Sequence, residues 1–218
     1  MNADPVPHPR RHLDQPADIS TARGAVGSSF IYVNADVENY ASDSYDILMT
    51  TTSDSMAGSP VTSEIEPQAF RRVLGHFLTG VAVVATMNEN EPVGLTVGSF
   101  FSISLDPPLV GFCAAHSSVT WPIIKRSGRF CVNVLAADQE GVSRKFARTG
   151  ANKFDGVRWA VSDSGCPRLD DVIAWIDCDI EVVYGAGDHE ICVGRVQALG
   201  DGRLSAPLPF FRGQHQIC

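Results

Sequence analysis

The chain has 218 residues, 44% of them hydrophobic, and a formal net charge of −8, which together indicate one globular domain with an appendage. The acidic balance argues against a nucleic-acid partner, because phosphate backbones are bound by clustered Lys and Arg and the chain has only three lysines. No stretch approaches the ~20 apolar residues that cross a bilayer and the N-terminus lacks a secretory signal, so we expect no membrane contact.

Residues 1–63 differ in composition from the rest of the chain. They hold eight acidic and three basic residues, a net charge of −5, and no Cys, Lys or Trp. Such a segment buries too little apolar surface to offset the entropy of ordering, which predicts a mostly disordered, acidic extension before a folded domain over residues 64–218. A start codon assigned too far upstream explains the segment equally well.

An amphipathic helix is expected where the domain begins. Pro67 suits a first helical turn, and apolar residues recur at i, i+3, i+4, i+7 and i+8 from Phe70 to Leu78. Gly80 would close this helix. A buried strand over Val81–Met87 and a turn over residues 88–91 follow.

The most unusual stretch is residues 94–114. Alternation and β-branched residues predict two strands joined by a proline-fixed turn at residues 106–108. The first of these strands carries several glycines and small hydroxyl residues, where a strand that only filled a core would carry Val, Ile and Leu. Small residues of this kind in a strand let a ligand or another backbone come close.

A short helix is predicted to end near Ser127, capped by Ser118 or Thr120. The hydroxyls of Ser117, Ser118 and Thr120, together with free N–H groups at a helix start, would suit an anion, although capping alone accounts for them at least as well. A strand over Arg129–Leu135 follows. Next, Asp138 is expected to cap a helix that runs through Phe146.

After a loop-rich section to Asp171, apolar residues over Ile176–Val182 alternate with acidic ones, which predicts a half-buried strand with one wet face. Residues 185–189 are expected to turn into a strand over Glu190–Leu199. His189, next to Asp188 in that turn, is a candidate for contacting a ligand, and equally a solvent-exposed residue. The mostly antiparallel strands and three short helices predict a barrel with helical plugs.

Several familiar sites are missing from the sequence. It has no glycine-rich dinucleotide or phosphate-binding loop, and its six histidines show no metal-ligand spacing. The six cysteines form no CxxC pair, and four of them lie among apolar residues in predicted strands. We therefore expect reduced core cysteines in a cytoplasmic protein, and no metal site.

Five motifs, in order, resemble the flavin reductase domain of two-component flavin monooxygenases. They are FRRVLGHFLTGVAVVAT, GLTVGSFFSISLDPPLVGFC, HSSVTW, GRFCVNVLAADQEGVSRKFA and GDHEICVGRV. The likeness runs from about Ile65 to Gly213, roughly two thirds of the chain. It implies an FMN-binding split β-barrel, mostly β with short helices, that forms a homodimer with flavin near the interface.

The resemblance also implies an activity. NADH or NADPH would reduce FMN, FAD or riboflavin by hydride transfer, and the reduced flavin would pass to a partner monooxygenase. His189 would face the nicotinamide as the catalytic candidate. The resemblance implies that Thr96, Val97 and Ser99 line the flavin and that Ser117, Ser118 and Thr120 bind its phosphate. Asn133 would lie near the flavin ring or its ribityl chain, and Arg212 would add positive charge near the cofactors.

Two positions depart from the pattern of the family. Gly98 stands where members often have Ser or Asn, and Phe101 where they often have Thr. These losses put in doubt how tightly flavin is held and which flavin is preferred. They leave open a non-catalytic flavin-binding protein, or an oxidase with resident flavin that acts directly on a small molecule.

Overall fold

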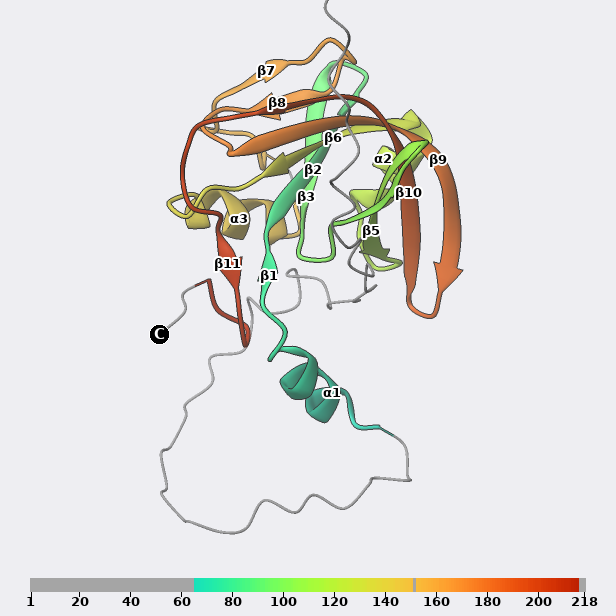
Figure 1. Cartoon of the computed structure of the whole chain (residues 1–218), viewed down its shortest axis with the longest axis vertical. Coiled ribbons are helices and arrows are strands. Elements are labelled where there is room, and N and C mark those ends of the chain that lie inside the picture. The colour runs from blue at the N-terminus through green and yellow to red at the C-terminus, as the bar shows by residue number, and fades with distance from the viewer. Residues whose placement is uncertain (1–64, 151, 216–218) are drawn as a thin grey trace, which may run out of the picture.

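The computed structural model describes residues 65–150 and 152–215 (Figure 1). The extension predicted over residues 1–63 lies outside this part of the chain. The helices are α1 (Pro67–Leu74), α2 (Trp121–Ser127) and α3 (Glu140–Ala147). The strands are β1 (Thr79–Gly80), β2 (Ala82–Asn88), β3 (Glu91–Val97), β4 (Phe101–Leu105), β5 (Pro108–Ala115), β6 (Arg129–Val134), β7 (Trp159–Val161), β8 (Pro167–Leu169), β9 (Ala174–Ala186), β10 (His189–Asp201) and β11 (Pro209–Phe210).

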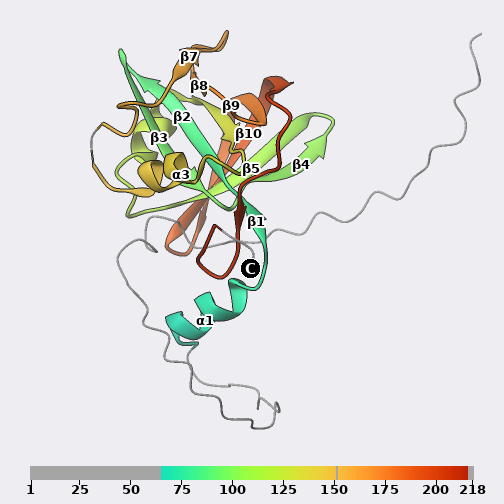
Figure 2. The same ribbon diagram turned by 90° about the vertical axis from the view of Figure 1, so that its left-hand side faces the viewer.

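The main sheet has seven antiparallel strands in the order β3-β2-β6-β9-β10-β5-β4. Its two edge strands, β3 and β4, are consecutive in the chain and are joined by residues 98–100 alone. In a flat sheet of seven strands the edges would lie about 29 Å apart, whereas a link of this length reaches only about 14 Å. The sheet must therefore curl on itself, and the antiparallel barrel predicted from the sequence is confirmed (Figures 1 and 2).

The prediction of one continuous strand through residues 94–104 was wrong. This stretch is divided between β3 and β4, which have different partners: Val97 pairs with Ala82 of β2, and Phe101 pairs with Gly111 of β5. The alternation of side chains continues past residue 98, but the hydrogen-bonding partner changes there. Local periodicity carries no information about that change.

Both faces of the barrel wall are buried along β2. Ala82 and Val84 point into the barrel interior, while Val83 and Ala85 point outward into a second core. This outer core lies under α3, the β7–β8 hairpin and the segment that leads into β11. The continuous apolar run of β2 follows from having a core on each side.

Aromatic rings fill the barrel interior. Phe112 packs edge-to-face against Phe130 at 5.3 Å and against Trp121 at 5.5 Å between ring centroids. Gly194 of β10 lies against the Phe130 ring, so closely that an added Cβ would stand 2.6 Å from it. A residue without a side chain at this position thus makes room for the ring.

Asp177 on β9 does not lie on a wet face as predicted. Its side chain is buried opposite Cys131 of β6 and near Cys166, the residue before β8, because the β7–β8 hairpin covers this part of the sheet. Burial raises the pKa of the Cys131 thiol, and the Asp177 carboxylate raises it further. The five cysteines in the described residues are all buried, as the sequence predicted for four of them.

Helix α1 is shorter than predicted and packs differently. It ends at Leu74, with Gly75 after it, because the chain beyond must extend to pair Thr79 with Phe210 of β11. None of its residues is buried, and both views show it beyond the barrel wall (Figures 1 and 2). Phe70 and Val73 on its apolar side are 46% and 61% exposed.

Candidate functional site

The link between the edge strands is fixed to β5 by Ser99. The Ser99 hydroxyl accepts a hydrogen bond from Cys113 N at 2.9 Å and donates one to Cys113 O at 3.2 Å. Only 4% of Ser99 is exposed. The small polar residue noted in the sequence therefore lets another backbone come close, and it helps to close the barrel.

His189 lies at the same end of β5. It is the first residue of β10 and pairs with Ala115, the last residue of β5, while Asp188 O accepts from His116 N at 2.9 Å. The prediction that His189 belongs to the turn was wrong. β9 and β10 run on to a tight hairpin in which Gly187 has φ +69°, so only residues 187 and 188 form the turn.

The orientation of the His189 ring is set by its neighbour. Its Nδ1 lies 2.7 Å from Asp188 Oδ1, and its side chain is 11% exposed while that of Asp188 is 93% exposed. The hydrogen bond from His189 lowers the pKa of the Asp188 carboxyl. An exposed carboxylate thus holds a buried imidazole next to the loop that follows β5.

The three hydroxyls in that loop have different surroundings. Ser118 Oγ accepts a hydrogen bond from Trp121 N at 3.2 Å, so Ser118 satisfies the start of α2. Thr120 occupies the N-cap position, yet its side chain makes no capping bond. Ser117 is exposed. Of the two predicted capping residues, Ser118 is the one that caps.

Helix α2 is tied to β10 beside His189. Trp121 Nε1 donates to Glu190 Oε2 at 2.6 Å, and Lys125 Nζ lies 2.7 Å from Glu190 Oε1. The hydrogen bonds from Lys125 and Trp121 lower the pKa of the Glu190 carboxyl. The loop with the three hydroxyls is consequently held between two anchored elements.

A cavity of about 760 Å³ opens on the other side of Thr120. Its wall is formed by the start of β3, the start of α2, Gly150 and residues 152–155, and includes Lys153. Lys153 is 8% exposed, donates to Phe146 O at 2.9 Å and lies 3.5 Å from Thr120 Oγ1. Sequence analysis did not select Lys153, because a single lysine in a loop-rich section gives no local signal.

Thr96 and Asn133 lie on the outer side of the barrel wall, where their side chains hold the fold together. Thr96 Oγ1 donates to Ser143 O of α3 at 2.9 Å. Asn133 Nδ2 donates to three carbonyl oxygens, and Asn133 Oδ1 accepts from Leu169 N at 2.7 Å, which fixes β8 to the sheet. Their flavin contacts stay predictions, and this arrangement offers an alternative reason for both residues.

The remaining two predicted residues lie apart from each other. Val97 is 1% exposed and belongs to the core inside the barrel. Arg212 is exposed, and its N–H donates to Gly75 O just beyond α1. Within one chain, Ser99, Ser118 and His189 therefore lie around the end of β5, and Thr120 lies in the loop after it. Arg212 does not lie near them.

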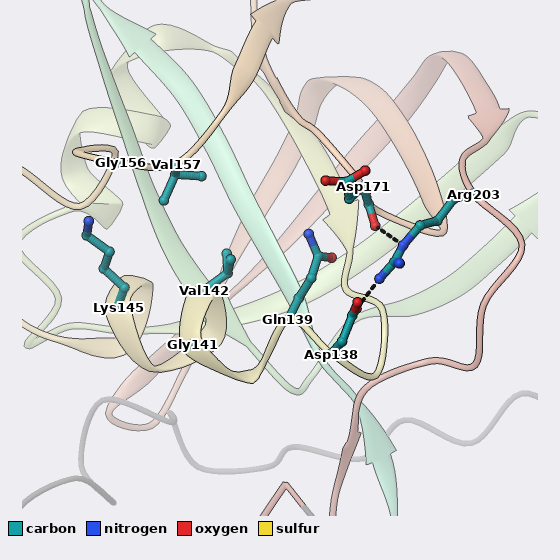
Figure 3. A pocket seen from close by; sticks show the side chains of 9 residues that line it. All are labelled: Asp138, Gln139, Gly141, Val142, Lys145, Gly156, Val157, Asp171 and Arg203. Atoms are coloured by element: carbon teal, nitrogen blue, oxygen red, sulfur yellow. Dashed lines mark hydrogen bonds and ion pairs between the residues drawn. The ribbon is translucent and has the colours of Figure 1, made fainter.

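A second pocket, of about 540 Å³, lies beside α3 (Figure 3). Arg203 there binds the Asp138 carboxylate and donates to Asp171 O at 2.8 Å. The prediction that Asp138 caps α3 was therefore wrong, because its carboxylate is engaged by Arg203 and the N-cap position falls on Gln139. None of the residues predicted for a site lines this pocket, and its arginine, Arg203, is already engaged by Asp138 and by the Asp171 carbonyl.

Within residues 65–150 and 152–215, no helix has the length and apolar character to cross a bilayer, and no three His, Cys, Asp or Glu side chains are grouped as metal ligands would be.

Known proteins resemble this chain over the whole barrel. A family model described as a flavin reductase like domain matches residues 74–217. A flavin reductase of Pseudomonas putida is 46% identical over 72% of this chain and 94% of its own length. The reductase subunit HsaB of a flavin-dependent monooxygenase from Rhodococcus jostii is 44% identical over 72% of this chain and 81% of its own length.

A solved structure is similar as well. The NADH:FAD oxidoreductase SgcE6 of Streptomyces globisporus, in complex with NAD and FAD fragments, superposes with a TM-score of 0.65. It is 34% identical in sequence, and the match covers 70% of this chain and 94% of that one.

Proposed function

This chain belongs to the flavin reductase family, and from that premise we propose that it binds its flavin around the end of β5. It is an NAD(P)H-dependent oxidoreductase that reduces flavin and supplies it to a separate monooxygenase. A non-catalytic flavin-binding protein and an oxidase with resident flavin are not favoured by these relatives.

The observation that carries the proposed location is the convergence on Ala115. Ser99 is bonded two residues before it, His189 pairs with it, and the loop with Ser118 follows it. The adjoining cavity of about 760 Å³ is within the size range of small-molecule sites. Buried hydroxyls and an imidazole suit a flavin, whose ring edge and side chain carry many hydrogen-bonding atoms.

The chemistry of the site asks mainly for positioning. When bound, the flavin supplies the acceptor for a hydride from the nicotinamide, so the cofactors carry the reaction itself. The chain must hold two rings at reacting distance and keep water out. The Ser99 bonds to β5 make one wall rigid, and Asp188 sets the orientation of the His189 ring on the other.

We also propose that the protein acts as a homodimer in the cytoplasm. Helix α1 supports the dimer, since Phe70 and Val73 expose an apolar face that a second copy would bury. Cys131, Cys166, Cys178 and Cys192, which are buried and form no disulfide, suit a reducing compartment. Light scattering after gel filtration tests the dimer, and fluorescence of the tagged protein in its host tests the compartment.

The activity is tested by following nicotinamide absorbance with purified protein and NADH, with and without added FMN. Rapid loss of NADH only with FMN is the expected result, because flavin is a diffusible substrate here. Loss without added flavin in yellow protein would indicate a resident cofactor. No loss with either NADH or NADPH would contradict the proposed activity.

His189 is tested by His189→Ala, with Leu199→Ala, at an exposed position on the same strand, as control. We expect the rate of hydride transfer to fall roughly 10- to 100-fold while the flavin dissociation constant stays within about threefold, because a misplaced nicotinamide affects the reaction more than flavin binding. Stopped-flow absorbance measures the first quantity and flavin fluorescence the second. An unchanged rate would remove His189 from the site.

A further inference from the structure

We propose that Glu190 is a positioning residue for hydride transfer, because it accepts the hydrogen bond of the Trp121 indole and so fixes the loop before α2 relative to His189. This inference rests on the proposed function, since it takes His189 and that loop as two sides of the site. Glu190 and Trp121 lie 69 positions apart in the chain, and no motif spacing connects them.

Two consecutive residues of β10 face opposite sides of the barrel wall. His189 pairs with Ala115 of β5, and Glu190 pairs with Ala114, which belongs to the core inside the barrel. Successive side chains of a strand point to opposite faces, so the Glu190 side chain points toward the barrel interior and that of His189 points away from it. An element bound to Glu190 is therefore placed within one residue of His189.

Helix α2 is supported by a different part of the sheet. It packs on β2, β3 and β6, and Thr86 Oγ1 of β2 donates to Ser127 Oγ at the end of the helix at 2.9 Å. In the strand order, β2 is separated from β10 by β6 and β9. The loop before α2 and His189 are thus carried by separate parts of the barrel, and their relative position depends on what joins these parts.

Trp121 is the residue of α2 that reaches β10. It is the first residue of the helix, is 2% exposed and packs edge-to-face on Phe112 at 5.5 Å between ring centroids. Its Nε1 donates to Glu190 Oε2 at 2.6 Å, a short bond of the kind that an ionised acceptor makes. This bond fixes the loop at its α2 end, while the bond from His116 N to Asp188 O fixes its β5 end.

The ion pair between Glu190 and Lys125 constrains the helix less. Lys125 Nζ lies 2.7 Å from Glu190 Oε1, but the Lys125 side chain is 45% exposed, so water and salt screen the pair. The buried indole is held in place by its packing and has no comparable freedom. The position of α2 relative to β10 therefore depends mainly on the bond between Trp121 and Glu190.

A displacement of α2 would affect the reaction more than the binding of flavin. Hydride transfer needs its two atoms about 3–3.5 Å apart, and a misplacement of about 1 Å costs roughly 100-fold in rate. The loop would keep its hydroxyl groups after such a shift, so flavin would still find its hydrogen-bonding partners. The expected signature is a slower hydride transfer with little change in the KM for flavin.

The test measures hydride transfer to FMN by stopped-flow absorbance in Glu190→Ala and Glu190→Gln. Glu190→Ala removes the acceptor, and we expect the rate to fall about 10- to 100-fold while the KM for FMN stays within about threefold. Glu190→Gln keeps an oxygen that accepts the Trp121 bond, so its rate should fall by no more than about threefold. Glu181→Ala is the matched control, because it removes an exposed glutamate that pairs with Arg195 in the same two strands, and it should keep the wild-type rate.

Trp121→Phe tests the same bond from its donor and keeps a ring against Phe112. We expect the rate to fall as it does in Glu190→Ala, with no further fall when the two changes are combined, because each removes the same bond. Should Glu190→Ala fail to fold, Trp121→Phe decides alone, and an unchanged rate there overturns the inference.

Four other results also overturn it. They are an unchanged rate in folded Glu190→Ala, losses that multiply in the double variant, a raised KM for FMN with an unchanged rate at saturating FMN, and an equal loss in Glu190→Gln and Glu190→Ala. The third would assign Glu190 to binding, and the fourth would assign the effect to its charge.

The outcome is separable from that of the proposed function. If wild-type protein reduces FMN and Glu190→Ala does so at the same rate, the positioning role is excluded while the reductase activity stands. If wild-type protein reduces no flavin with either nicotinamide, the proposed function itself is contradicted.

Discussion

Helix α1 and the barrel interior carry equally regular apolar patterns, but they have opposite surroundings. Phe112 and Phe130 inside the barrel are fully buried, whereas Phe70 of α1 is 46% exposed. The periodicity of a segment shows that it has an apolar face. Whether other parts of the same chain bury that face depends on how the strands and helices are arranged. The chain buries both faces of β2 and β6, but it leaves the apolar face of α1 exposed. We therefore propose that a second copy of the chain covers α1.

The largest effect is expected inside the barrel. Phe130→Ala would remove a ring that packs against Phe112 and faces Gly194, and we expect the free energy of unfolding to fall by about 3–5 kcal/mol. Urea unfolding followed by fluorescence measures it. Leu199→Ala, at a position that is 66% exposed, is the control. A loss below about 1 kcal/mol for Phe130→Ala would place the stabilising core elsewhere.

Asn133 tests the outer side of the same wall. Asn133→Ala would leave Leu169 N and several carbonyl oxygens without their partner, so we expect a loss of about 2–4 kcal/mol of unfolding free energy. The KM for FMN should stay within about threefold if the role is structural. Intact stability together with a sharply raised KM would instead support the flavin contact predicted from the sequence.

Helix α1 is expected to respond in the opposite way. Phe70→Glu combined with Val73→Glu should leave unfolding of the monomer within about 1 kcal/mol of wild type, because these side chains are already exposed. The same change should convert the proposed dimer to monomers in light scattering. Arg71→Gln on the same helix is the control. A variant that remains dimeric would require a different interface.

The smallest effect concerns His215, which lies between these extremes in the outer layer. Its Nε2 is 3.3 Å from Ser143 Oγ, and burial lowers its pKa, with Glu140 opposing and Arg144 adding to the shift. Below about pH 6.5 the unfolded chain binds a proton more readily than the folded chain, so this residue lowers stability as the pH falls.

His215→Phe should therefore make the melting temperature fall less steeply between about pH 7 and pH 5. Over this range the unfolding free energies of the variant and the wild type should differ by less than roughly 1 kcal/mol. Scanning calorimetry at several pH values measures it. Gln214→Ala, at an exposed position next to it, should leave the profile as it is in the wild type. An identical slope in His215→Phe would show that His215 titrates equally in both states.

Much of the fold was predictable because most of its strands can be recognised from the local alternation of apolar and polar residues. The alternation of Phe130, Val132 and Val134 correctly predicted β6 and its inner face. The break after Val97 and the short β7–β8 hairpin were not predicted, since each depends on which distant strand offers a hydrogen-bonding partner. Asp177 was misplaced for the same reason, because the element that covers it comes from another part of the chain.

The site was predictable only where a motif held its residues together. Ser118 and Thr120 are two residues apart, and the motif placed them correctly in one loop. Lys153 lies 33 residues from Thr120 in the chain, yet the two side chains meet in one cavity. No spacing rule connects them, since the contact arises from how the segment after α3 returns to the start of α2.

The pairing of β1 with β11 determines how the molecule would respond to force. Thr79 lies opposite Phe210 and Gly80 opposite Pro209, so the two chain directions that lead to the termini leave this small sheet at the same end. A pull on the two termini therefore opens its hydrogen bonds one after another, as a zipper opens, rather than shearing them together. Mechanical load would first release the helix α1 segment and the C-terminal segment, and reach the closed barrel only afterwards.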